Sequence, residues 1–167
     1  MIERAKPQRG VIEFKPMPQA LARVVLHITF STKHREPFLK DGEVRSDLHA
    51  YMARVLQQID CEPILVNGVE DHIHILCNFS RTITIASLIE EVKTGTSKWI
   101  KTQGPQYEDF FWQRGYGVFS ISQSDVDETR KYVAGQEEHH RHVSFQEEFR
   151  TLCRKHGIEI DEKYVWD

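Results

Sequence analysis

The stretch PILVNGVEDHIHILCNF, residues 63–79, decides the fold, because it places two short apolar segments on either side of a turn signal. The periodicity predicts one strand over residues 63–69 and a second over residues 72–79. The Asn67-Gly68 pair is typical of a hairpin bend, so we expect the chain to reverse there. The stretch therefore predicts an antiparallel hairpin.

The second predicted strand also carries the sharpest candidate site. Side chains two apart in a strand project to the same face, so His72 and His74 would lie about 7 Å apart along the chain and could converge on one metal ion. Ile73 and Ile75 would point to the opposite face, into the core. The alternative is that both histidines are half-buried strand residues with satisfied hydrogen bonds.

The flanking segments complete a β-α-β-β-α-β order. Alternating apolar residues predict a first strand at 24–30, and apolar residues at three- and four-residue spacing predict a helix at 41–60. We expect a second helix at 86–101, a strand at 110–121, a third helix from a capping box at Asp125 and Glu128 to about His140, and a final helix at 144–157. This order predicts an α+β, ferredoxin-like (split β-α-β) fold: an antiparallel sheet with two helices on one face and additional C-terminal helices.

Composition sets the wider limits. The 167 residues are 40% apolar, so a real core is expected, and their formal charge of −3 excludes a strongly basic protein that coats duplex DNA through bulk charge. Three cysteines without a CxxC pair argue against a disulfide framework and a cysteine-rich zinc site. The absence of a long apolar run and of a signal-type N-terminus predicts a cytoplasmic protein without a membrane partner.

The chain reads as one domain with two appendages. Residues 1–20 hold three of the six prolines and show little periodicity, which predicts a flexible N-terminal arm. Residues 21–157 contain all the regular signals and form the predicted single catalytic domain. Residues 158–167 are predicted to form a C-terminal tail.

Two histidines are too few for a metal site, so a further ligand is expected. Asp71, the histidines among residues 139–142, and side chains of the third helix are all candidates. In that helix Tyr132 and Gln136 are four residues apart and share a face. The amide oxygen of Gln136 suits Mg²⁺ or Mn²⁺, and a phenol beside such an ion is a candidate nucleophile. The alternative for Tyr132 is packing or hydrogen bonding without catalysis.

Together these pieces resemble a known family. The HIH of VEDHIHIL resembles the paired-histidine motif of the HUH single-strand nucleases, and a lone Tyr-x-x-x-Gln helix after the fourth strand is similar to that of the single-tyrosine transposases of IS200-like insertion sequences. LHITFSTKHREPF, the Lys-Trp-Ile-Lys helix end and FWQRGYGVFSIS support the resemblance, which covers residues 24–145. The parts before Leu21 and after Phe145 do not map onto it.

The resemblance implies a specific chemistry. His72, His74 and Gln136 would bind Mg²⁺ or Mn²⁺, and Tyr132 would attack a DNA phosphate to form a 5′-phosphotyrosine bond and release a 3′-hydroxyl. The substrate would be single-stranded DNA with hairpin ends, at the ends of an insertion sequence. The family acts as homodimers in the prokaryotic cytoplasm, at the nucleoid, and its tyrosine helix is able to serve the partner chain's site.

Basic and aromatic side chains provide candidate DNA contacts despite the net negative charge. Aromatic rings can stack on bases and cations can hold phosphates. A solvated helix face is the alternative for the lysines. The candidates are Lys33, Arg35, Lys93, Lys98, Lys101, Trp112 and Arg114.

Three functions stay in competition. The first is a metal-dependent DNA strand transferase that uses Tyr132. The second is a domesticated module that binds structured single-stranded DNA or RNA without cleaving it. The third is a metal-dependent hydrolase with a water nucleophile, in which the tyrosine is incidental. A covalent protein–DNA adduct distinguishes the first from the other two.

Overall fold

The computed structural model describes residues 20–166, so the predicted N-terminal arm lies outside the described residues except for Ala20. Four strands form one antiparallel sheet in the order β2-β3-β1-β4. Their bounds are β1 Val25–Ser31, β2 Glu62–Gly68, β3 His72–Asn78 and β4 Gly117–Ile121. This is the strand order of the predicted ferredoxin-like fold, which is therefore confirmed.

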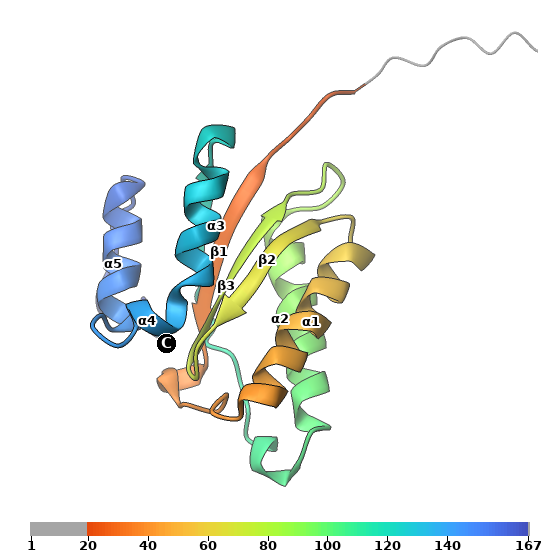
Figure 1. The fold of residues 1–167 in the computed structure, drawn as a ribbon, viewed down its shortest axis with the longest axis vertical. Helices are drawn as coiled ribbons and strands as arrows, with labels where there is room; N and C mark the ends of the chain where they lie inside the picture. Colours follow the sequence, from red (N-terminus) through yellow and green to blue (C-terminus); the bar gives the residue numbers. More distant parts are fainter. Residues whose placement is uncertain (1–19, 167) are drawn as a thin grey trace, which may run out of the picture.

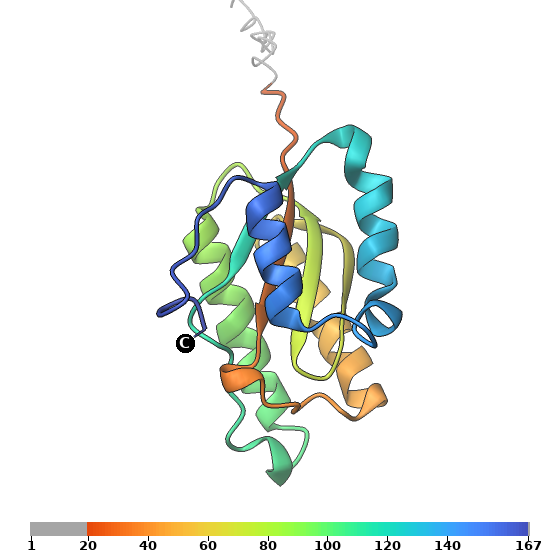
Figure 2. The ribbon, with the colours of Figure 1, turned by 90° about the vertical axis from the view of Figure 1, so that its left-hand side faces the viewer.

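Helices cover both faces of the sheet (Figures 1 and 2). On one face lie α1 (Gly42–Gln58) and α2 (Ile85–Lys101), which are the two crossover helices of the split β-α-β units. On the other face lie α3 (Val126–Ala134) and α5 (Phe145–Lys155), with the short α4 (Gln136–His139) between them in the chain. The C-terminal helices thus cover the face that the order of elements alone leaves open.

The main core lies between the sheet and the α1–α2 layer. Ile28 and Phe30 of β1 and Ile73 and Ile75 of β3 are all completely buried there. Their alternation with polar residues follows from the two-residue period of a strand, as predicted. The intervening side chains of β1 and β3 therefore face α3 and α5.

Two strand boundaries differ from the sequence prediction. Asn67 and Gly68 do not form the bend; they pair with His74 and Ile73 as the last residues of β2. The reversal occupies 69–71 instead. The fourth strand begins only at Gly117, because residues 110–116 form a loop, in which Trp112 forms an isolated bridge with Thr32, the residue after β1.

The predicted third helix is broken. The chain leaves helical geometry at Gly135, which separates α3 from α4. The expected capping box at its start is wrong, because the Asp125 side chain makes no cap hydrogen bond. At α5, by contrast, Ser144 and Glu147 form a complete capping box. This cap fixes where α5 begins and therefore which of its residues face the sheet.

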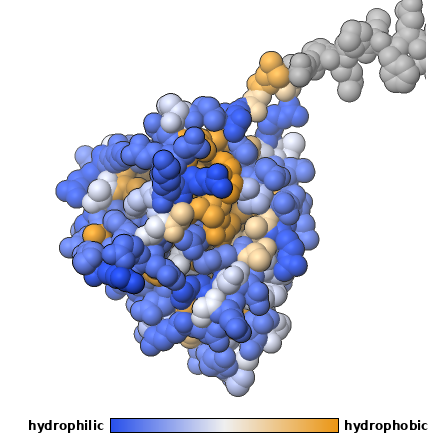
Figure 3. All heavy atoms as spheres, viewed as in Figure 1, coloured by the Kyte–Doolittle hydropathy of each residue, from blue (hydrophilic) through white to orange (hydrophobic). Residues whose placement is uncertain are grey.

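The end of the chain packs on α5. Ile160, Val165 and Trp166 contact a small apolar cluster around Phe149, and Arg150 forms an ion pair with Glu162. The face seen in Figure 3 is mostly hydrophilic, with one apolar patch across its upper half. None of the helices within residues 20–166 is both long enough and apolar enough to span a bilayer.

Candidate metal centre and nucleophile

Strand β3 holds the two predicted histidines on the face away from the main core. His72 and His74 are completely buried under α3, α4 and α5, and each has a fixed partner on its outer side. His72 Nδ1 lies 2.6 Å from an Asp71 carboxylate oxygen, and His74 Nδ1 lies 2.8 Å from His27 Nε2. The Nε2 atoms are thereby aimed at the space between the sheet and α5.

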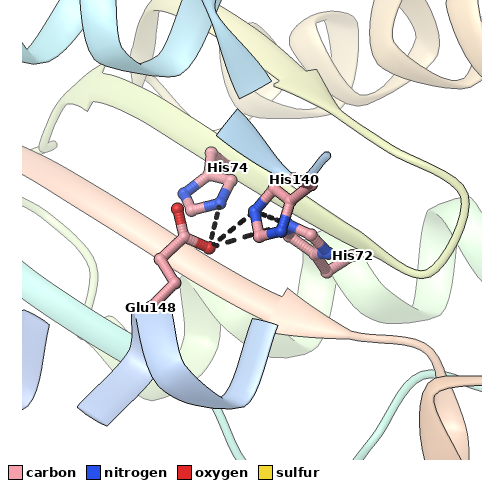
Figure 4. A group of neighbouring side chains, drawn as sticks. All are labelled: His72, His74, His140 and Glu148. Atoms are coloured by element: carbon pink, nitrogen blue, oxygen red, sulfur yellow. Dashed lines mark hydrogen bonds and ion pairs between the residues drawn. The ribbon is translucent and has the colours of Figure 1, made fainter. Parts of the chain in front are cut away.

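Two further side chains complete the cluster (Figure 4). His140, directly after α4, places its Nε2 atom 2.9 Å from His72 Nε2. Glu148 of α5 places one carboxylate oxygen 3.0 Å from His140 Nε2 and 3.3 Å from His74 Nε2. One ligand atom from each of the four residues lies within 4.8 Å of all the others. Such a group of imidazoles and a carboxylate can hold a metal ion.

The cluster is electrostatically coupled. Burial would raise the pKa of Glu148, but the hydrogen bond from His140 and the nearby imidazole of His74 hold it well below its usual range. Burial would lower the pKa of His140, but the hydrogen bond and charge of Glu148 raise it above its ordinary value. Burial lowers the pKa of His74, and burial together with the charge of His74 lowers the pKa of His27 to about 3. Glu148 is therefore an anion, and the imidazoles of His74 and His27 are held neutral.

Tyr132 and Gln136 meet at the same carboxylate, from α3 and α4. The Tyr132 hydroxyl donates a hydrogen bond to Glu148 Oε1, and Gln136 Nε2 donates to the same oxygen over 3.1 Å. Gln136 Oε1 lies 3.5 Å from His72 Nε2. Thus all four predicted site residues (His72, His74, Tyr132 and Gln136) lie around one centre, within a single chain.

The phenol is held in its neutral form. Burial raises the pKa of Tyr132 far above its ordinary value, and the negative charge of Glu148 raises it further. A nearby cation would oppose the effect of that charge. Tyr132 can therefore act as a nucleophile only when a positive charge beside it favours the phenolate.

Two clefts reach residues of the centre. One, of about 440 Å³, is lined by Arg35, Arg45, Asp71, His140 and Phe145, among others. The other, of about 700 Å³, lies beside Tyr132, Glu148 and His156. Arg35, a predicted DNA contact, therefore lines a cleft that leads to the centre.

The remaining predicted DNA contacts fall into two groups. Lys33, Lys98 and Arg114 are exposed and Lys101 is half-buried; Lys33 and Lys101 lie over the ring of Phe111, which is 50% exposed. Trp112 is only 8% exposed, and its indole N–H donates to Thr96 in the core.

Lys93, like Trp112, is bound within the protein. Its ammonium donates to three backbone carbonyls, those of Gln113, Arg114 and Gly115, and burial lowers its pKa to about 8. We therefore correct the predictions for Trp112 and Lys93, which stabilise the loop before β4 rather than face a ligand.

The sequence prediction missed Glu148. The signal was a carboxylate on the buried stripe of an amphipathic helix, whose other buried residues are Phe145, Phe149 and Cys153. Acidic residues are almost never fully buried unless they are paired, so this position pointed to a cationic partner. His140 was among the candidate ligands, but nothing in the sequence distinguished it from its neighbours.

Comparison with known proteins places the chain in a family. The chain matches the model of the IS200-like transposases over residues 20–136. A candidate transposase from Deinococcus radiodurans R1 has the same fold, with a TM-score of 0.56 and 19% identity, over 74% of this chain and 98% of that chain. A REP-associated tyrosine transposase bound to a REP hairpin gives a TM-score of 0.48 and 13% identity, over 72% of this chain and 68% of that chain.

No curated protein matches the chain. The family model, however, spans well over half of it, from Ala20, five residues before β1, to Gln136 beside the histidine pair. The protein therefore belongs to the IS200-like transposase family.

Proposed function

We propose that this transposase cleaves and rejoins single-stranded DNA through a covalent bond to Tyr132, with a divalent ion held by His72, His74 and Gln136. The observation that supports this most directly is that the Tyr132 hydroxyl and the imidazole of His74 both contact the Glu148 carboxylate. A nucleophile and a candidate metal centre therefore lie within reach of one phosphate.

The residues present fit the ion. His74 Nε2 is buried and has no hydrogen-bond partner within the described part of the chain, although it faces the cluster. An unpaired buried imidazole nitrogen is costly unless a cation or donor meets it. The Gln136 amide oxygen adds a hard, neutral donor of the kind that Mg²⁺ or Mn²⁺ accepts. When bound, the ion would supply Lewis-acid stabilisation of the charge on the transferring phosphoryl group.

The chain's own residues account for the proton and the leaving group. The Tyr132 oxygen forms a bond to phosphorus while the bond from phosphorus to the 3′ oxygen breaks. The phenol proton leaves along its hydrogen bond to Glu148 and on to solvent, and the departing 3′ oxygen takes up a proton to become a hydroxyl. Attack by a 3′-hydroxyl on the phosphotyrosine reverses these changes and rejoins DNA without an external energy source.

The DNA would cross the surface at the end of β1. Arg35 lines the cleft that leads to His140, and Lys33 and Lys101 flank the exposed ring of Phe111. An aromatic ring between cations is suited to stacking on an unpaired base while the cations hold the backbone. Lys98 and Arg114 are exposed and remain proposed contacts. A hairpin-bearing end and a homodimer are part of the proposal, as the family resemblance implies.

The test is covalent capture. Purified protein is mixed with labelled single-stranded DNA carrying a hairpin, with Mg²⁺ or Mn²⁺, and resolved on a denaturing gel. A labelled protein band is expected from the unaltered chain and none from Tyr132→Phe, with DNA binding retained. Tyr164→Phe, which changes an exposed tyrosine, is the matched control.

Two other results would change the assignment. Cleavage by Tyr132→Phe would show that the nucleophile is a different group, and cleavage without any adduct would indicate a hydrolase. Binding that survives both chelation and His72→Ala, without cleavage, would identify a non-cleaving module instead.

A further inference from the structure

The three imidazoles of the cluster make hydrogen bonds away from the centre through Nδ1, which leaves each Nε2 atom facing the centre. His72 Nδ1 contacts a carboxylate at 2.6 Å, and His140 Nδ1 contacts the Val143 carbonyl at 2.7 Å. Both partners only accept hydrogen bonds, so each Nδ1 atom carries the proton and each Nε2 atom of the neutral ring is a lone pair. His74 Nδ1 lies 2.8 Å from His27 Nε2, and the tautomer in which His74 Nδ1 donates this hydrogen bond leaves His74 Nε2 as a lone pair as well.

These lone pairs converge and cannot satisfy one another. The Nε2 atoms of His72 and His140 are 2.9 Å apart, and the carboxylate of Glu148 lies 3.0 Å from one and 3.7 Å from the other. A single proton on His140 satisfies only part of this group and leaves His74 Nε2 without a hydrogen-bond partner among residues 20–166. A metal ion placed between the four ligand atoms would give each of them a partner.

The donor set decides which ion. Bonds of about 2.0–2.1 Å in a tetrahedral site put neighbouring ligand atoms about 3.3 Å apart. The separations between ligand atoms here include 2.9, 3.0, 3.3 and 3.7 Å, on both sides of that value. Three nitrogens and one carboxylate favour Zn²⁺ over Mg²⁺, because Mg²⁺ takes oxygen ligands and keeps its waters.

We infer that His140 and Glu148 join His72 and His74 in a three-imidazole, one-carboxylate centre that takes a transition-metal ion of the Zn²⁺ class in preference to Mg²⁺. Both added ligands lie beyond residue 136, where the family model ends. The inference keeps the histidine pair of the proposed function but replaces Gln136 with His140 and Glu148 as the further ligands, and it rests on that function only for the presence of an ion at the pair.

A four-ligand centre has a consequence for DNA. Catalytic zinc sites keep one position open for water or substrate, whereas closed four-ligand sites are structural. Glu148 is the only anion among the ligands, and it also holds the Tyr132 hydroxyl. It is therefore the ligand that a DNA phosphate would displace, and its departure would release the phenol.

The experiment measures metal binding without DNA. Full-length protein is stripped with a chelator, and Zn²⁺ and Mg²⁺ are titrated in separate calorimetric runs. We expect Zn²⁺ to bind more tightly by on the order of 100-fold or more. Substitution with Co²⁺ should give the intense visible absorption of a four-coordinate nitrogen–oxygen site, a readout that requires no variant.

Variants then test the two added ligands. Glu148→Gln and His140→Ala should each weaken Zn²⁺ binding by at least about 10- to 100-fold, the loss known for a supporting partner alone. Glu138→Gln and His142→Ala change exposed neighbours and should bind Zn²⁺ like the unaltered chain. Circular dichroism confirms that each variant is folded.

The outcomes separate this inference from the proposed function. Equal affinities for Zn²⁺ and Mg²⁺, or full Zn²⁺ affinity in both Glu148→Gln and His140→Ala, would overturn the four-ligand centre even if the Tyr132 adduct forms. A four-coordinate Co²⁺ spectrum in a protein that forms no adduct would support the centre and refute the strand transferase.

Discussion

The hydroxyl of Tyr132 donates a hydrogen bond to the carboxylate of Glu148, so a candidate nucleophile is held by a residue of a different helix, 16 positions further along the chain. In this arrangement the carboxylate opposes ionisation of the phenol, because a negative charge beside it disfavours the phenolate. The same carboxylate faces the imidazoles. The charge of Glu148 therefore affects both the ionisation of Tyr132 and the binding of an ion at the candidate metal centre.

The first prediction concerns this charge. In metal-free Glu148→Gln, the pKa of Tyr132 should fall from its raised value by on the order of 1–3 units, because the neutral amide no longer opposes the phenolate. NMR of ring-labelled tyrosine across an alkaline titration measures it, and Tyr132→Phe assigns the signal. An unchanged pKa would mean that burial alone raises it.

A second prediction tests His27 as a positioning residue. Its Nε2 atom lies 2.8 Å from His74 Nδ1 and orients that imidazole. His27→Leu should weaken binding of Zn²⁺ or Mn²⁺ by about 10- to 100-fold, whereas His27→Gln, which keeps an acceptor, should recover most of it. Calorimetry on both variants gives the comparison. Equal affinities in the two would assign His27 a packing role only.

The third prediction separates two lysines that the sequence alone treats alike. Lys93→Met removes the donor to three carbonyls and should lower the free energy of unfolding by about 1–3 kcal/mol. Lys98→Met alters an exposed side chain and should stay within about 0.5 kcal/mol. Urea denaturation of both variants measures the difference. A similar small effect in both would contradict the internal role of Lys93.

These two lysines show where sequence reasoning stops. The two-residue period of a strand fixed the opposite faces of His72 and Ile73, and the structure confirms them. A lysine or tryptophan, however, can stabilise a buried loop as readily as it can bind DNA at a surface. Only tertiary contacts could therefore exclude Lys93 and Trp112 from the predicted DNA contacts.

The same limit applies to the centre itself. The elements were predictable because their apolar periods are local, whereas the contact between Glu148 and the histidines depends on how α5 docks. That docking joins residues 74 positions apart in the chain, for His74 and Glu148, and no local pattern encodes it. The break at Gly135 was likewise hidden, because residues 136–142 contain no apolar residue and so no periodic pattern shows whether the helix continues.

A fourth prediction concerns the proposed DNA surface. Phe111→Ala should weaken binding of single-stranded DNA by about 1–3 kcal/mol through loss of base stacking. Lys101→Ala should lower the slope of log affinity against log salt by about 0.7, the value for one phosphate contact on a single strand. Fluorescence anisotropy at several salt concentrations measures both. Unchanged binding in both variants would place the DNA elsewhere.

The fifth prediction is an acid-sensitive contribution from His49, on α1 and away from the centre. Burial and the charge of Arg45 lower its pKa from 6.5 to about 4, so between these values the unfolded chain takes up a proton that the folded chain does not. Stability from neutral His49 is complete above pH 6.5 and is lost as the pH falls through 4, by up to about 3 kcal/mol.

The matched variant for this effect is His49→Gln. Its free energy of unfolding should fall less steeply between pH 6.5 and 4 than that of the unaltered chain, as followed by urea denaturation at each pH. His27 titrates in both proteins, so the difference isolates His49. Parallel pH profiles would contradict the prediction.

The joint at Gly135 has a mechanical consequence. Helix α3 is tied to β2 by the Asn67 amide, which donates to the carbonyls of Val133 and Ala134, while Gln136 belongs to the next helix and contacts the imidazoles separately. Tyr132 and Gln136 therefore lie on two different helices, which are linked at the joint by the hydrogen bond from the Gln136 amide to the Tyr132 carbonyl. Lengthening or stiffening the chain at Gly135 would therefore turn Tyr132 toward a neighbouring molecule while the ligands of the ion keep their positions.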